Sequence, residues 1–247
     1  MRHCNVRGFN PGITVRNSRS NCTLVPSIGC PDMTLCLRLA TEADLGAIAA
    51  VSAAAFHPTT DAIARRLFPP HLQPPDVQDG DAARPWRLTR KTSNLDAKRT
   101  VMMVVVDEAL EGAIVGFSVW EAPVRGEEDE EETNLPEKPC AALDHVALAE
   151  MRRLVVEDAK RRFGERESKD VWHLGYIGVD PQNHRRGIGK MLLDWGLKQG
   201  VNEGIDCYLV ATPAGRPFYQ AAGFDVVESF PIFGVPHYSM VMRNSPT

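Results

Sequence analysis

The sequence predicts an α/β protein with a mixed central sheet of about six or seven strands flanked by helices. Two observations carry this prediction. Strand-like and helix-like segments alternate along the chain, and hairpin-sized pairs of strands interrupt that alternation. The chain has 247 residues, 43% of them hydrophobic, which is enough for one or two domains of about 150 residues with a buried core.

Composition excludes several classes of protein. A net charge of −4 and a pI near 6.0 do not indicate a nucleic-acid-binding domain, for which a pI above about 9 is usual. The longest apolar run, 101–106, is far shorter than the roughly 18 residues of a membrane helix. The six cysteines include no C-x-x-C pair and no Cys/His spacing typical of zinc. We therefore expect free thiols, no metal, and neither nucleic acid nor membrane as a partner.

Residues 1–32 have the composition of a disordered leader, and Met33 is a candidate for the true start. They contain no apolar h-region of a secretory signal. The arginines and serines before Asp32 are compatible with mitochondrial import, but glycines and prolines would break the amphipathic helix that import requires. We expect a cytoplasmic protein, with mitochondrial import as the less favoured alternative.

A single domain is predicted over 33–247, beginning with a short alternating strand at 34–39. Residues 41–44 form a capping-box pattern that starts a helix. Further helical turns are expected at 61–68 and 86–98, separated by a loop rich in proline and aspartate.

The middle of the chain predicts a hairpin of two strands, 100–106 and 113–120. The acidic run 127–132 is typical of a solvated loop, because like charges this dense repel one another. A long helix with a stop at Gly164 follows, and the acidic loop and this helix form an insertion at about 121–168. The apolar stripe expected on that helix is Leu143, Val146, Ala147, Met151, Leu154 and Val155.

The last eighty residues alternate strand and helix and then close with two strands. The predicted strands are 171–179, 205–211, 224–229 and 238–243, and the predicted helices are 187–200 and 215–222.

A basic glycine turn, His184-Arg-Arg-Gly-Ile-Gly189, directly follows a predicted strand and begins a helix. Glycines allow close approach of the backbone to a ligand, and the first N–H groups of a helix have no helical partner. The helix dipole and the side chains of Arg185, Arg186 and Lys190 add positive charge. The turn therefore predicts a site for a pyrophosphate.

Three phosphate-binding motifs compete for this turn. A Walker P-loop requires glycine at His184 and serine or threonine at Met191, so it fails twice. A dinucleotide fingerprint finds Leu192 at its third glycine and comes too late in the chain. The third motif is that of coenzyme A.

Two motifs in order resemble the GNAT superfamily of N-acetyltransferases. That family's acetyl-CoA motif, Gln/Arg-x-x-Gly-x-Gly/Ala, is similar to 184–189, with His184 in the place of Gln or Arg. The segment 215–224 resembles the family's Tyr-x-x-x-Gly-Phe signature, with Tyr219 and Gly223-Phe224 at the right spacing. The resemblance implies a GNAT-type acyl-CoA N-acyltransferase fold that binds acetyl-CoA as co-substrate and uses no metal.

The resemblance also implies site residues. The coenzyme would be held by Ile177, Gly178, Val179, His184, Arg185, Arg186, Gly187, Ile188, Gly189 and Lys190. The first three would bind pantetheine through their backbone, where the alternative is an ordinary buried strand. Tyr219 matches the family's general acid, where the alternative is a core aromatic. His173 is similar to a histidine of the arylalkylamine branch and is a candidate base, with Glu121 as its rival and a structural histidine as the alternative.

The resemblance thus implies an acetyl-CoA-dependent N-acetyltransferase that transfers acetyl directly to a small-molecule or peptide amine in a ternary complex. A catalytically inactive acyl-CoA-binding module and a dinucleotide-binding oxidoreductase are the alternatives. Residues 56–99, 121–140 and 230–238 would select the acceptor, and they contain no readable motif. The sequence does not indicate the oligomeric state.

Overall fold

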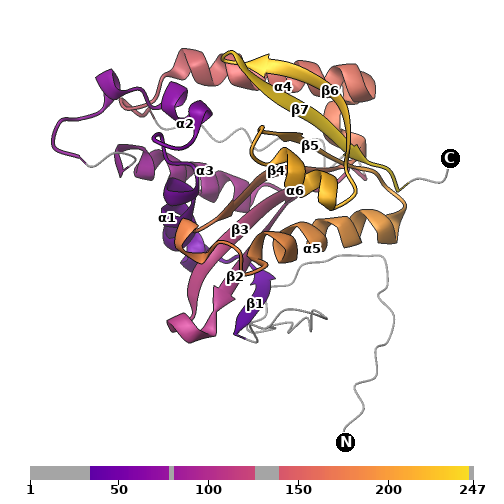
Figure 1. Cartoon of the computed structure of the whole chain (residues 1–247), viewed down its shortest axis with the longest axis horizontal. Coiled ribbons are helices and arrows are strands. Elements are labelled where there is room, and N and C mark those ends of the chain that lie inside the picture. Colours follow the sequence, from indigo (N-terminus) through magenta and orange to yellow (C-terminus); the bar gives the residue numbers. More distant parts are fainter. Residues whose placement is uncertain (1–33, 78–80, 126–138, 245–247) are drawn as a thin grey trace, which may run out of the picture.

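The structure is a computed structural model that describes residues 34–77, 81–125 and 139–244. Its centre is a seven-stranded mixed sheet with the order β1-β2-β3-β4-β5-β7-β6 (Figure 1). The predicted fold class and the number of strands are confirmed. The proposed leader, 1–32, lies outside the described residues, as does most of the acidic loop.

The first half of the sheet is antiparallel. It consists of β1 (Leu35–Leu39), β2 (Thr100–Asp107) and β3 (Ala113–Glu121). The β2–β3 pair is the predicted hairpin. Hydrophobic residues occupy both faces of β2, which is buried on both sides from Met102 onward. This double burial explains why β2 appears in the sequence as a continuous apolar run.

The second half contains one parallel neighbour pair. β4 (Trp172–Val179) is antiparallel to β3 and parallel to β5 (Cys207–Ala211). β7 (Val235–Met242) is antiparallel to both β5 and the edge strand β6 (Asp225–Ile232). The β6–β7 hairpin is longer than the two predicted strands, because pairing continues to a tight turn at Phe233 and Gly234.

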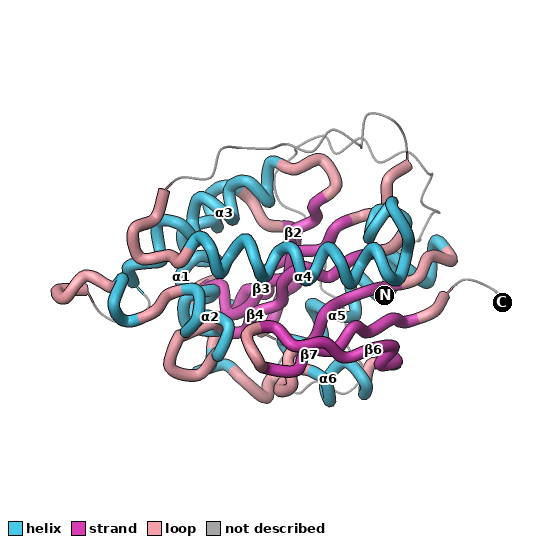
Figure 2. Tube along the Cα trace, turned by 90° about the horizontal axis from the view of Figure 1, so that it is seen from above, coloured by secondary structure: helices cyan, strands magenta, loops and turns pink. Residues whose placement is uncertain are grey.

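One face of the sheet is covered by α1 (Leu45–Ala55), α3 (Arg84–Asp96) and α4 (His145–Phe163). The short α2 (Ala62–Leu67) packs with the start of α4 through a cluster that contains Leu67 and Leu148. Figure 2 shows α4 extending along the sheet toward β6 and β7.

The opposite face is covered by α5 (Ile188–Glu203) and the short α6 (Arg216–Ala221). Ile188 and Leu192 of α5 pack against β1, β2 and β3, and Leu193 packs against Trp120 and β5. Both layers therefore meet β4 and β5, which form the centre of the candidate site.

The predicted stripe of α4 is wrong at Val146, whose exposed fraction is 78%. The rest of the stripe is right, because Leu143 and Ala147 are buried and Met151, Leu154 and Val155 are half-buried. Val146 instead shares the exposed face of the helix with Glu150 and Arg153, and Leu148 completes the buried face. Gly164 ends α4 as predicted.

Cys140 and Cys207 are free thiols, as predicted, but the prediction is wrong for Cys36, which is disulfide-bonded. Across the described ranges, no helix is long and apolar enough to cross a membrane.

Candidate active site

The parallel strands β4 and β5 part after only two residue pairs. Trp172 pairs with Cys207 and His173 with Tyr208, and the pairing stops there, while β4 continues along β3 to Val179. Gly175 is the extra residue of a bulge in β4, because Val119 pairs with Tyr176 and Trp120 with Leu174. From Tyr176 to Val179, the edge of β4 toward β5 therefore pairs with no strand among the described residues. An extended ligand could pair with this edge as an additional strand would.

The glycine turn follows β4 and leads into α5. Gly187 is the N-cap of α5 with a φ of 82°, a left-handed conformation that favours glycine. No side chain of the described ranges caps this helix end. The bond from Met191 N to Gly187 O, 3.0 Å long, leaves the N–H groups of Ile188, Gly189 and Lys190 without a helical carbonyl. The turn can therefore hold an anion through its backbone.

The side chain of Arg186 ties the turn to the end of β2. Its guanidinium lies 2.7 Å from Asn183 Oδ1 and 2.7 Å from Asp107 Oδ2 at the end of β2. Asp107 is 1% exposed. Although burial favours its protonated form, Arg186 and Thr34 hold the pKa of Asp107 below its ordinary value. Arg186 is thus bound to the protein, so any contact between Arg186 and a ligand would come from its main chain.

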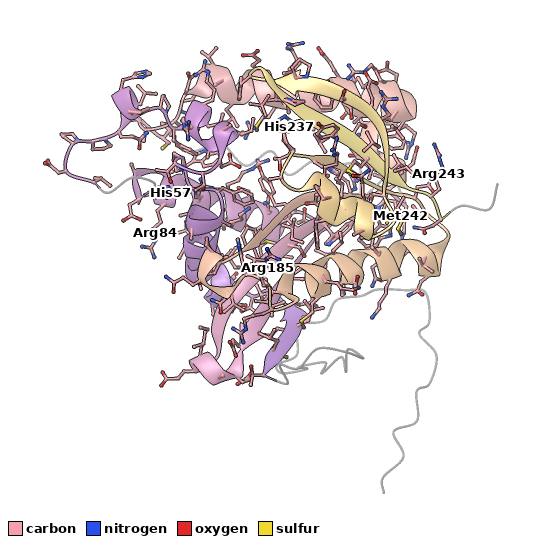
Figure 3. The ribbon with its side chains drawn as sticks, in the orientation of Figure 1. His57, Arg84, Arg185, His237, Met242 and Arg243 are labelled. Atoms are coloured by element: carbon pink, nitrogen blue, oxygen red, sulfur yellow. The ribbon has the colours of Figure 1, made fainter. Side chains whose placement is uncertain are left out.

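The other polar side chains of the turn face outward. Arg185 lies beside the start of α5 in Figure 3 and is exposed. Lys190 forms an exposed ion pair with Asp194, with 2.6 Å between Nζ and Oδ2. His184 Nε2 lies 3.2 Å from the carbonyl oxygen of Val179, so this side chain ties the turn to the last residue of β4.

Tyr219 lies on α6, on the same side of the sheet as α5. Its ring packs edge-on against Phe218 and Phe224, with centroids 5.2 and 6.1 Å away. Phe218 in turn lies against Gly189, so α6 touches the glycine turn. Burial raises the pKa of Tyr219 above its ordinary value. The phenol therefore keeps its proton at neutral pH and can donate it.

His173 and Glu121 form a pair across β4 and β3. Nδ1 of His173 lies 3.1 Å from Oε2 of Glu121, and the His173 side chain is 15% exposed. Although burial favours the protonated carboxyl group, His173 and Arg99 hold the pKa of Glu121 below its ordinary value. A carboxylate that accepts from Nδ1–H leaves Nε2 as the basic nitrogen. The two residues, predicted as rivals, are instead arranged to act together.

The orientation of the His173 imidazole is fixed by stacking on Tyr208. It stacks on Tyr208 with centroids 5.2 Å apart and an interplanar angle of 28°. Tyr208, which is fully buried, donates a hydrogen bond of 2.7 Å to Asp158 of α4. The chain Asp158–Tyr208–His173 connects the inserted helix to the site. Neither Tyr208 nor Asp158 belongs to a motif, so sequence analysis missed both of them.

Tyr219 and His173 lie on opposite faces of the sheet. Tyr219 packs in the cluster under α5 with Trp120 and Leu209, whereas His173 lies with Tyr208 on the side of α4. The parting of β4 and β5 separates these faces. A ligand between the strands could therefore meet a proton donor on one side and a base on the other.

Two buried cations near the site were not predicted. Arg87 and Lys91 of α3 are 7% and 3% exposed, and both contact the aromatic rings beneath the helix. Their signal in the sequence is the helical spacing of polar residues on α3. That spacing is equally typical of a solvated face. Among the described residues, no group of histidines, cysteines and carboxylates could hold a metal ion.

Comparison with known proteins gives one family. The family described as Acetyltransferase (GNAT) domain matches residues 99–226. A curated "Probable acyltransferase SID5" from Ajellomyces capsulatus is 31% identical over 117 residues, which cover 44% of this chain and 72% of that protein. An "Acetyltransferase" from Stachybotrys chartarum is 28% identical over 196 residues, which cover 77% of this chain and 80% of that protein.

A solved structure of similar fold is described as histone acetyltransferase HPA2 and related acetyltransferase from Corynebacterium glutamicum. It superposes with a TM-score of 0.56 over 85% of this chain and 97% of its own, at 20% identity. At this identity the likeness concerns the fold, and it includes the mixed sheet on which the site is built.

Proposed function

The chain belongs to the GNAT family of acetyltransferases, and on that premise we propose that it transfers an acetyl group from acetyl-CoA directly to an amine in a ternary complex. One observation carries this proposal. The unpaired edge of β4 from Tyr176 to Val179 continues into a glycine turn whose N–H groups are available. Such an edge suits pantetheine, which is extended and rich in amides, and the turn suits its pyrophosphate.

On the acceptor side, His173 takes the proton that the amine must lose. Nε2 accepts it, and the imidazolium is stabilised by Glu121 at Nδ1 and by the ring of Tyr208 beneath it. The free amine nitrogen then attacks the thioester carbon. A new C–N bond forms while the C–S bond breaks.

On the coenzyme side, the backbone N–H groups of Ile177 and Val179 point away from β3, so either can stabilise the charge that develops on the thioester oxygen, whereas the N–H of Gly178 points toward Phe117. Tyr219 donates its phenolic proton to the departing thiolate sulfur. Its raised pKa keeps the phenol protonated until the C–S bond breaks. Because a thiol, with an ordinary pKa of about 8.5, is the stronger acid, the phenol stabilises the thiolate chiefly by donating a hydrogen bond through its O–H. Any phenolate that forms is reprotonated from solvent, to which the new amide nitrogen releases its remaining proton.

Thiol release with a panel of amines tests the proposal. We expect acetyl-CoA-dependent release that requires both an amine and the intact chain. Binding of acetyl-CoA without release for any amine would instead favour an acyl-CoA-binding module that has lost catalysis. The pairing of His173 with Glu121 favours the enzyme, because a module that only binds acyl-CoA has no need of an oriented base.

A further inference from the structure

One face of α3 gathers positive charge against the acceptor side of the sheet. Arg87, Arg90, Lys91 and Asn94 follow one another at intervals of three, four and seven residues from the first, so they lie on one side of the helix. Arg99 follows the helix and binds Ala122 O, beyond β3, through Nε at 2.8 Å. The cluster thus spans α3 and the end of β3, where Glu121 lies.

Five side-chain nitrogen atoms of this cluster and of the neighbouring Trp86 are buried without a hydrogen-bond partner in the described part of the chain. They are Trp86 Nε1, Arg87 Nε, Arg90 Nε, Asn94 Nδ2 and Arg99 Nη2. All of these atoms are donors. A buried donor without an acceptor destabilises the folded chain, so these five donors along α3 and the segment after it indicate that acceptors are missing beside the helix.

The carboxylates that interact with this cluster lie at its two ends. Asp61 acts on Arg87 at one end, and Glu121 interacts with Arg90 and Arg99 at the other. Lys91 lies between them. Its ammonium nitrogen is 3.9 Å from the ring centroid of Tyr176 and 4.7 Å from that of Phe117, and no carboxylate of the described residues pairs with it. Burial and the charges of Arg87 and Arg90 lower the pKa of Lys91 to about 7.

Lys91 lies next to the candidate active site, so an acceptor bound at Lys91 would lie next to it as well. Tyr176 is the first residue after the bulge of β4, on the edge that parts from β5. Glu121 and His173 lie on the same face of the sheet, facing α3 and α4. A molecule that presents its amine to His173 can therefore extend toward Lys91. The long side chains of lysine and arginine can follow it by rotating about their χ angles.

We propose that the amine acceptor carries a carboxylate, which binds at Lys91 among the unpaired donors of α3. This inference rests on the proposed function and names its substrate class: an amino acid or an amine derived from one. The carboxylate places a negative charge beside Lys91, whose ammonium is repelled by Arg87 and Arg90, and gives the nearest unpaired N–H groups an acceptor. A polyamine would bring a further cation to the same place, and an unsubstituted arylalkylamine would leave the donors unpaired.

The test compares amines in pairs that differ by the carboxylate alone. Phenylalanine with phenethylamine and lysine with cadaverine are examples, and the panel extends to every common amino acid with its decarboxylated partner. We measure kcat/KM by thiol release and, independently of turnover, binding to the CoA-saturated protein by calorimetry. The variants are Lys91→Met, which retains the packing against Tyr176, and Arg84→Met, a control at an exposed position of the same helix (Figure 3).

We expect the carboxylate-bearing member of at least one pair to be preferred by about tenfold or more, the value of a charge-assisted hydrogen bond. Lys91→Met reduces that preference to about twofold and leaves the decarboxylated partner unchanged, while Arg84→Met leaves both unchanged. Thermal unfolding of each variant confirms that it is folded.

Three results would overturn the inference. The decarboxylated members could be preferred, no carboxylate-bearing amine could either bind or react, or Lys91→Met could abolish turnover of both members alike. The last result would assign Lys91 to proton transfer. Each of them leaves the proposed function intact as long as some amine reacts with acetyl-CoA.

Discussion

The glycine turn before α5 and the inner face of α3 are both proposed as sites for negative charge, but they are built differently. The turn would act through backbone N–H groups, and its residues are contiguous in sequence, from His184 to Lys190. The face of α3 acts through side chains whose role depends on Tyr176, Phe117 and Glu121 from distant strands. A backbone site leaves a motif in the sequence, whereas a side-chain site is visible only when the sheet is assembled.

The largest effect is expected at the backbone site. Valine at Gly187 must adopt a φ near 82°, which strains a β-branched residue and turns the N–H groups of the helix away from the ligand. We expect Gly187→Val to weaken acetyl-CoA binding about 1000-fold, because strain and charge-assisted hydrogen bonds add. Calorimetry measures the affinity. Gly46→Ala in α1, where an added Cβ meets nothing within 4 Å, is the control and should leave it unchanged.

The next effect separates binding from chemistry on the α5 side. Tyr219→Phe removes the proton donor but keeps the ring contacts with Phe218 and Phe224. We expect kcat to fall about 100-fold while the affinity for CoA stays the same. Tyr238→Phe on β7 is the matched control. Equal kcat for Tyr219→Phe and the parent chain would remove Tyr219 from the mechanism and leave it as a core aromatic.

The cationic face predicts an effect on stability with a clear dependence on pH. The pKa of Lys91 is lowered from 10.5 to about 7 in the folded chain, so between these values the unfolded chain binds the additional proton. The penalty of burying Lys91 is complete below pH 7 and disappears as the pH rises toward 10.5.

Lys91→Met should therefore raise the free energy of unfolding at pH 7 by about 2 kcal/mol, after the loss of the ring contacts. Urea unfolding at pH 7 and pH 10 measures the gain, which should shrink at the higher pH. A gain that does not change with pH would show that the lysine is neutral or charged alike in both states.

The smallest effect concerns the pair that faces the acceptor. Glu121→Gln retains a hydrogen-bond acceptor for His173 but loses the charge that stabilises the imidazolium. We expect kcat to fall about tenfold with little change in CoA affinity. Glu150→Gln, at an exposed position of α4, is the control. If Glu121→Gln reacts as fast as the parent chain, the base acts without its carboxylate.

Most of the fold could be predicted because its signals are local. The hairpin of β2 and β3, the end of α4 at Gly164 and the strand–turn–helix at 172–203 follow from periodicity and from glycines. The stripe of α4 was predicted except at Val146, which lies three residues after Leu143 but shares the exposed face with Glu150 and Arg153.

The site divides in the same way. The sequence predicted the turn, Tyr219 and His173, and all three remain predictions as functional residues. It treated Glu121 as a rival of His173, because their pairing depends on the register of β3 and β4. The sequence predicted that the Arg186 side chain binds the ligand, whereas in the structure its guanidinium forms an ion pair with Asp107, the last residue of β2. Lys91 was missed, since a lysine on a helix is usually solvated.

Titration of the intact protein with acetyl-CoA in a calorimeter tests the central claim most directly. The account predicts one site per chain with a dissociation constant in the micromolar range, of the order of 1–100 µM as for other co-substrates. It also predicts that the same titration fails with Gly187→Val. A folded parent chain that gives no heat and no shift in its unfolding temperature with acetyl-CoA would contradict the account.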